Sequence, residues 1–412
     1  MKKSYLMIAA AASIFAACGG NDIFREVEDQ NIPINFSQMA TEKATRAGAE
    51  LDMDWFHNTA KVGFGVYGFK GDPAAATKIF KNEQVKSSLA TAPYAWTHTT
   101  IRFWDKAVSN YNFYAYAPFA GTNNNDEGAN PSFDYTNGFT FTGLQIIANI
   151  EVDESTTLSP DKVVATAVEG VGYTSNKLHQ GGSYTVGSTT TNVADHANAP
   201  TVPFVFNHIL SKLSFKIYTP VKPNNYATES ERVANFTVKS IKIDFPTATS
   251  VTWAENGKNA AAAAGTTTYN SWAAKTGTKA AEAFETTVYS DATGTLVPYG
   301  ENSTAATAIG NTYIVTPVNS TVKKHEFDLQ VIYDIAYADG TTETGCIATG
   351  TIGTGNPELS SGDEGYDPNI YAPTQNQYYI AVIKLDPAQI EFCVEKVNEW
   401  DPNGQEVEAE VK

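Results

Sequence analysis

Residues 236–245 have the sequence FTVKSIKIDF, in which apolar and polar side chains alternate. The apolar positions are Phe236, Val238, Ile241 and Ile243, and the opposite face carries Lys239 and Lys242. A period of about two residues is the pattern of a β-strand that buries one face and exposes the other. This stretch therefore predicts a strand that covers an apolar core.

Similar patterns occur along most of the chain. Apolar or aromatic runs bounded by Gly, Asn and Pro predict strands at 61–69, 111–118, 139–144, 146–152, 202–217, 313–318, 326–335, 345–352, 378–385 and 390–397. Residues 173–200 are rich in Gly, Ser, Thr and Asn, and we expect a long loop there. No segment has the sustained 3.6-residue period of an amphipathic helix. Many short strands joined by turns predict an all-β protein made of β-sandwiches, and 412 residues suffice for two of them.

The composition limits the partners of the chain. Its formal net charge is −17. Nucleic acids and anionic membranes reward Lys and Arg, so we exclude both as partners. Besides the cysteine near the N-terminus, Cys346 and Cys393 either form a disulfide in an oxidising compartment or remain two separate thiols.

Residues 1–18 have the features of a bacterial export signal. Lys2 and Lys3 form a positive head, and an apolar run follows at residues 6–15. This run is shorter than the ~20 residues that a membrane span needs, and small residues come directly before Cys18. A cysteine at the cleavage position resembles the lipobox of bacterial lipoproteins. We therefore expect Cys18 to be lipidated; the alternative is an ordinary cleaved signal.

The next segment, 19–46, is polar apart from one short alternating patch. Ile32, Ile34 and Phe36 predict a single strand. Arg46 and Ala47 follow in a stretch of small residues, and an exposed basic site of this kind is easily reached by a protease.

Residues 406–412 alternate strictly between charged and apolar side chains. The apolar positions are Val407, Ala409 and Val411. This pattern also predicts a strand, which is either the last strand of its own domain or a strand offered to another chain.

No catalytic or metal-binding constellation stands out. Gly63, Gly65 and Gly68 have the spacing of a dinucleotide-binding loop, but aromatic residues lie between them and no helix is predicted to follow. A closely packed strand is the preferred interpretation. The histidines have no partner at a metal-ligand spacing, and we expect His208 to be a core residue bonded to backbone. We predict no enzyme activity and no cofactor.

Several segments together resemble the fimbrillin family of Bacteroidales, which are the subunits of type V pili. The matching pieces are the lipoprotein signal, 32–36 with 44–47, 62–67, 111–118, 206–213, 378–383 and 397–400. Their order and spacing extend over nearly the whole chain. The chain departs from the family pattern most at 255–282, an Ala- and Thr-rich insert.

The resemblance implies two tandem transthyretin-like β-sandwich domains, at 47–200 and 201–412, after the signal and a propeptide at 19–46. It also implies the partners: the lipoprotein export machinery, a trypsin-like surface protease and other fimbrial subunits. The expected location is first the outer membrane, as an exported lipoprotein, and then a cell-surface fimbrium used for adhesion.

The resemblance further implies a route of assembly. The protease cuts between Arg46 and Ala47, and the strand that contains Ile32, Ile34 and Phe36 leaves. A donor strand, matched here by 406–412, then enters from the next subunit. Arg46 and the alternating tail favour a stalk position, and a tip position is the alternative. The alternative from another class is a monomeric surface lipoprotein that binds glycan or host protein through its Trp and Tyr side chains.

Overall fold

The structure is a computed structural model, and almost all of its regular elements are strands. It describes residues 32–41, 51, 53–71, 76–89, 95–123, 130–135, 137–145, 147–149, 160–166, 171–174, 177–179, 183–186, 189–192, 201–244, 251–255, 266–268, 284, 286–317, 327–353, 373, 375–386 and 389–397. Helical structure within these residues is confined to α1 (Met53–His57), η2 (Glu229–Glu231) and η3 (Ser303–Ala305). None of the helices described is long and apolar enough to span a membrane. The predicted all-β class is confirmed.

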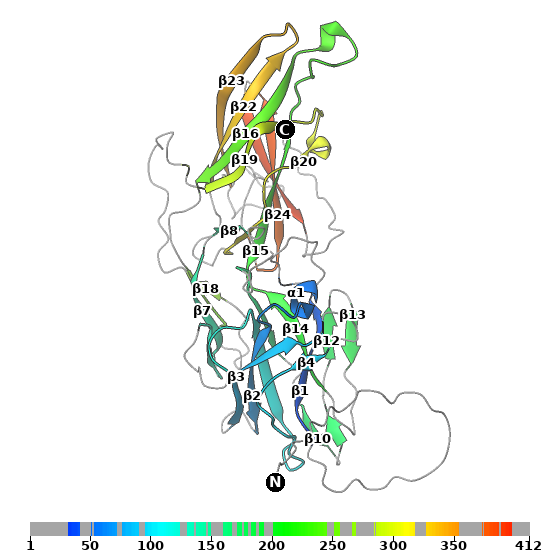
Figure 1. Ribbon diagram of the computed structural model, residues 1–412, viewed down its shortest axis with the longest axis vertical. Helices are drawn as coiled ribbons and strands as arrows, with labels where there is room; N and C mark the ends of the chain where they lie inside the picture. The colour runs from blue at the N-terminus through cyan, green and yellow to red at the C-terminus, as the bar shows by residue number, and fades with distance from the viewer. Residues whose placement is uncertain are drawn as a thin grey trace, which may run out of the picture.

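One end of the molecule is built on a seven-stranded sheet (Figure 1). Its strands, in spatial order, are β1 (Asn35–Thr41), β14 (Thr201–His208), β9 (Val163–Thr166), β5 (Tyr111–Ala117), β2 (Phe64–Lys70), β3 (Thr77–Ser87) and β4 (Trp96–Thr97). A four-stranded sheet accompanies it, in the order β18 (Thr266–Thr268), β17 (Val251–Ala254), β7 (Gly138–Leu144) and β6 (Ser132–Asp134).

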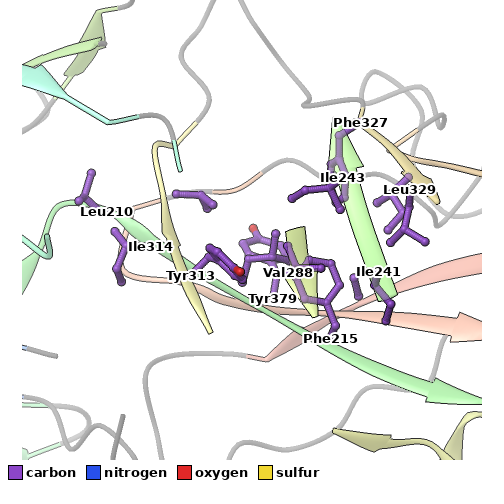
Figure 2. Close-up of a cluster of buried hydrophobic side chains, with 14 of the residues drawn as sticks. Leu210, Phe215, Ile241, Ile243, Val288, Tyr313, Ile314, Phe327, Leu329 and Tyr379 are labelled. Atoms are coloured by element: carbon purple, nitrogen blue, oxygen red, sulfur yellow. The ribbon is translucent and has the colours of Figure 1, made fainter. Parts of the chain in front are cut away.

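Two further sheets form the other end. The first has the order β25 (Gln389–Val397), β24 (Tyr378–Asp386), β15 (Ser211–Tyr218), β21 (Tyr313–Val315) and β8 (Ile147–Asn149), with β20 (Thr307–Ala308) paired to β15. The second has the order β19 (Thr286–Leu296), β16 (Ala234–Asp244), β22 (Phe327–Tyr337) and β23 (Thr342–Ile352). Figure 2 shows side chains of both sheets meeting in one apolar cluster, with Phe215 and Tyr379 from the first and Ile241 and Leu329 from the second.

The strand that opened the sequence analysis is β16, and its spacing has a structural cause. Phe236 and Val238 are two positions apart, as are Ile241 and Ile243, but Val238 and Ile241 are three positions apart. The register of β16 against both neighbours shifts between Val238 and Ser240, which is a β-bulge. The extra residue keeps all four apolar side chains on the buried face, where each is at most 1% exposed.

The expectation of a long loop at 173–200 is wrong in part. Two short hairpins lie there: β10 (Gly172–Thr174) with β11 (Lys177–His179), and β12 (Ser183–Val186) with β13 (Thr189–Asn192). Polar strands of three or four residues carry too little apolar patterning to be recognised in the sequence.

Some strands of each predicted domain belong to sheets of the other predicted domain. β14, β17 and β18 follow the predicted boundary at 200 but belong to sheets of the first part, whereas β8 precedes it and pairs with β21 in the second. The division into domains at 47–200 and 201–412 stays a prediction.

Candidate functional site

The strand β1 lies at the edge of the seven-stranded sheet. It pairs in parallel with β14, from Asn35 opposite Thr201 to Thr41 opposite Phe206 (Figure 1). The residues just before β1 use a different neighbour. The backbone N–H of Ile34 donates to the carbonyl of Arg102 at 2.8 Å, and the N–H of Trp104 donates to the carbonyl of Ile32 at 2.9 Å. Residues 32–41 are therefore held by two separate segments of backbone.

The inward side chains of this segment enter the core. Ile34 is 0% exposed and Phe36 is 2% exposed, whereas Pro33 is exposed and Asn35 is half-buried. Ile32 is partly buried against the same cluster. Burying a large apolar side chain contributes about 1.5–3 kcal/mol, so Ile34 and Phe36 together contribute roughly 3–6 kcal/mol. The alternation predicted for the three residues is present in the structure.

The ring of Phe36 has four aromatic neighbours. Its centroid lies 5.1 Å from that of Phe80, 5.3 Å from His98 and 5.7 Å from Phe113, each in an edge-on geometry. It also stacks on Phe204, with the centroids 6.0 Å apart. We call these four side chains, the paired edge of β14 and the backbone of residues 102–104 the β1 site.

A buried carboxylate holds the segment that contains His98, one of the four side chains around Phe36. Glu83 is 0% exposed, and its Oε1 accepts from the backbone N–H groups of Thr99 at 2.7 Å and Thr100 at 2.8 Å. The Nδ1 of His98 lies 3.0 Å from the carbonyl oxygen of Thr100. Because a carbonyl can only accept, Nδ1 carries the proton and donates. These bonds set the orientation of the His98 ring against Phe36.

The chain beyond residue 50 is anchored independently of β1. Leu51 is 0% exposed, and its N–H donates to Asp161 Oδ2 at 3.3 Å. Phe56, in α1, is 1% exposed and stacks on Phe206 with ring centroids 4.8 Å apart. A cut between residues 41 and 51 would therefore leave both ends attached to the fold, with β1 held by non-covalent contacts alone.

The Asp161 carboxylate, which accepts from the N–H of Leu51, also lies beside a buried histidine. His208 Nδ1 lies 2.8 Å from Asp161 Oδ2, and both side chains are at most 1% exposed. His208 is thus the core residue that the sequence predicted, and a carboxylate from residue 161, which is distant in sequence, lies beside it. Next to it, burial lowers the pKa of Lys162 to about 8, partly offset by the Asp161 charge.

Other predicted site residues lie outside the described part of the chain. These are Cys18, Arg46, Ala47, Val407, Ala409 and Val411. Ile32, Ile34 and Phe36 are the predicted site residues that the structure brings together. Sequence reasoning missed their partners: Phe80 lies in β3, a strand that the sequence did not predict, and His98 carried no signal beyond its type.

Two of the three glycines of the nucleotide-like spacing are strand residues, and Gly63 directly precedes the strand. Gly65 and Gly68 lie in β2, and a Cβ on Gly65 would overlap the ring of Tyr116. The interpretation as a closely packed strand is confirmed. Among the described residues, no group of three or more His, Cys, Asp or Glu side chains could hold a metal ion.

Cys346 is a free thiol on β23, so it is not part of a disulfide. Burial and the neighbouring Glu343 carboxylate raise the pKa of this thiol. The thiolate is the reactive form, and a raised pKa makes it scarcer at neutral pH.

Known proteins were compared with the chain in sequence and in structure. No family model and no curated protein matches it. In structure it is similar to a fimbrial protein from Bacteroides vulgatus, with a TM-score of 0.44 and 16% identity over 90% of this chain and 100% of that one. It is also similar to the tip fimbrial protein Mfa3 from Porphyromonas gingivalis, with a TM-score of 0.34 and 14% identity over 83% of this chain and 95% of that one. Both of these neighbours are named as fimbrial proteins.

Proposed function

We propose that this chain is a structural subunit of a cell-surface fimbrium and that it polymerises head-to-tail by strand exchange. The observation that carries the proposal is the placement of β1. It is an edge strand that fills an apolar core with Phe36 and with Ile34 just before it, yet it is joined to the rest of the fold through a segment that contains Arg46.

The proposed sequence begins with export. Cys18 is lipidated and carries the precursor to the outer membrane. A trypsin-like surface protease then cuts after Arg46, which separates the lipid and β1 from the remainder of the chain. Leu51 and α1 stay in place because their own contacts hold them.

Loss of β1 makes the vacated site a strong acceptor. The edge of β14 loses its backbone partner, and the core around Phe204 loses two large side chains. Unpaired N–H and C=O groups and exposed apolar surface are both costly in water. An incoming strand restores the ladder with its backbone and fills the core with alternate side chains.

The geometry of such a contact generates a filament. The acceptor is built around residues 32–36, and the proposed donor is at 406–412. A contact between different surfaces of successive subunits is heterologous and does not close on itself. A cleavable strand and a free donor strand together suit a stalk position; a tip subunit would use only the acceptor.

The alternative of a monomeric glycan-binding lipoprotein gains little support from the described tryptophans. Trp55, Trp104 and Trp253 are at most 6% exposed and pack the core rather than offer a stacking surface. Trp96 is partly buried against the same cluster as Trp55 and Trp104.

Limited proteolysis tests the proposal. The protein starting at Gly19 is treated with a low dose of trypsin, and the product is followed by N-terminal sequencing and by SDS gels without boiling. We expect a new N-terminus at Ala47 and SDS-resistant ladders. Arg46→Gln should prevent both, whereas Lys43→Gln, a change of the neighbouring basic residue, should prevent neither. Cleavage without ladders, or ladders that persist after deletion of 406–412, would contradict the proposed donor.

A further inference from the structure

The β1 site holds a large apolar side chain at each of two positions. Ile34, which directly precedes β1, and Phe36, in β1, are inward residues that are completely or almost completely buried. The Phe36 ring is surrounded by side chains from separate parts of the sheet: Phe80 from β3, Phe113 from β5 and Phe204 from β14. Any strand that replaces β1 has to fill the same two positions.

The walls of this site are fixed. Phe80, Phe113 and Phe204 are each 0% exposed and belong to three strands of one sheet. The fourth wall, His98, is oriented by its bond to Thr100. Protein interiors are packed as densely as organic crystals, and such walls relax only partly when a side chain becomes smaller. A smaller occupant would therefore leave a cavity.

The chain's own donor candidate is small at both positions. Its apolar residues are Val407, Ala409 and Val411. If these three replace Ile32, Ile34 and Phe36, Ala409 takes the place of Ile34 and a valine takes the place of Phe36, whichever way the strand runs. Trp400 is the one aromatic residue in 398–412, and its alternate neighbours are Asn398 and Pro402. No register of this segment combines an aromatic ring with a large aliphatic side chain two positions away.

We propose that the β1 site is built for the donor strand of a different subunit, one that carries an aromatic ring at the position of Phe36 and a branched aliphatic residue two positions from it. This inference rests on the proposed function and specifies its partner. A second copy of this chain fills this site less well than that partner does, so in a mixture of subunits the site takes the partner's strand in preference to residues 406–412 of another copy.

Peptide competition tests the partner. The protein starting at Gly19 is cut after Arg46, freed of its 19–46 fragment and incubated with a fluorescent peptide of residues 29–41, whose binding is followed by anisotropy. Competitors are the unlabelled 29–41 peptide, the 398–412 peptide, and two enlarged forms of it that combine Ala409→Ile with either Val407→Phe or Val411→Phe. A peptide with Glu408→Phe is the matched control, because it adds the same bulk to the outward face.

We expect the natural 398–412 peptide to compete at least about 100-fold more weakly than 29–41, which corresponds to about 2.8 kcal/mol at 1.4 kcal/mol per tenfold change. One enlarged form should recover at least tenfold, and the Glu408→Phe control should recover nothing. Equal competition by the natural and enlarged peptides would overturn the inference while the proposed function stands. If the fluorescent 29–41 peptide binds the cut protein no better than the uncut protein, both the proposed function and the inference fail.

Discussion

Replacing Phe36 by alanine removes the ring at the centre of the β1 site. Phe→Ala substitutions in protein cores cost about 3–5 kcal/mol, and the cost is greater where the surroundings cannot collapse. Phe36 is 2% exposed, and three of its four aromatic neighbours lie on separate strands of one sheet. We therefore expect the upper half of this range, about 4–5 kcal/mol, in the uncut protein. Since a domain is stable by only about 5–15 kcal/mol, the loss is large.

Urea unfolding followed by tryptophan fluorescence measures this loss. Trp55, Trp96 and Trp104 all belong to or pack against the apolar cluster that contains Phe36, so their fluorescence reports on it. Ile101→Ala is the matched control, because Ile101 lies close to the site in the 98–104 segment but is 64% exposed. Its effect should stay within about 0.5 kcal/mol. A Phe36→Ala loss below 1 kcal/mol, close to that of the control, would refute the account of the β1 site.

Three further changes test other contacts by thermal unfolding. Asp161→Asn removes a charge that faces a buried histidine; we expect a loss of about 3–5 kcal/mol, and an unchanged midpoint would contradict the pairing. Burial lowers the pKa of Lys162 from 10.5 to about 8, so the unfolded chain binds more protons between these pH values. Stability should therefore rise with pH across this window, and Lys162→Gln should abolish that rise. Gly138 has a φ of +86°, and a Cβ there would overlap the Glu255 carboxylate. Gly138→Ala should lower the free energy of unfolding by at least about 3 kcal/mol. Gly143→Ala, whose Cβ would meet open space, should lower it by only about 1 kcal/mol through backbone strain. Equal losses for the two variants would contradict the predicted cost of the overlap with Glu255.

The sequence predicts the strands that alternate clearly and misses those that bury polar groups. β3 has Asn82 and Glu83 in its centre, both 0% exposed. A sequence pattern assigns such residues to a turn, because the bonds that satisfy them come from elsewhere. The N–H groups that Glu83 accepts belong to residues 99 and 100. The wall of the β1 site was for this reason not predictable from local sequence.

The candidate site was also predicted only in part from the sequence. The triplet Ile32, Ile34 and Phe36 was found from its period of two, which is local information. That Phe36 meets Phe204 depends on the parallel pairing of β1 with a strand more than 160 residues away. Local periodicity indicates that a strand exists but not its neighbour, so the partners of β1 required the structure.

The central claim is that the place of β1 is taken by another strand, and hydrogen exchange along β14 tests it most directly. The backbone amides of 201–206 are compared in the uncut protein, in the cut protein freed of its 19–46 fragment, and in the assembled ladder. The account predicts slow exchange, then faster exchange, then slow exchange again in a ladder that no longer contains the fragment. Ladders that still retain the 19–46 fragment, with β14 protected throughout, would contradict it.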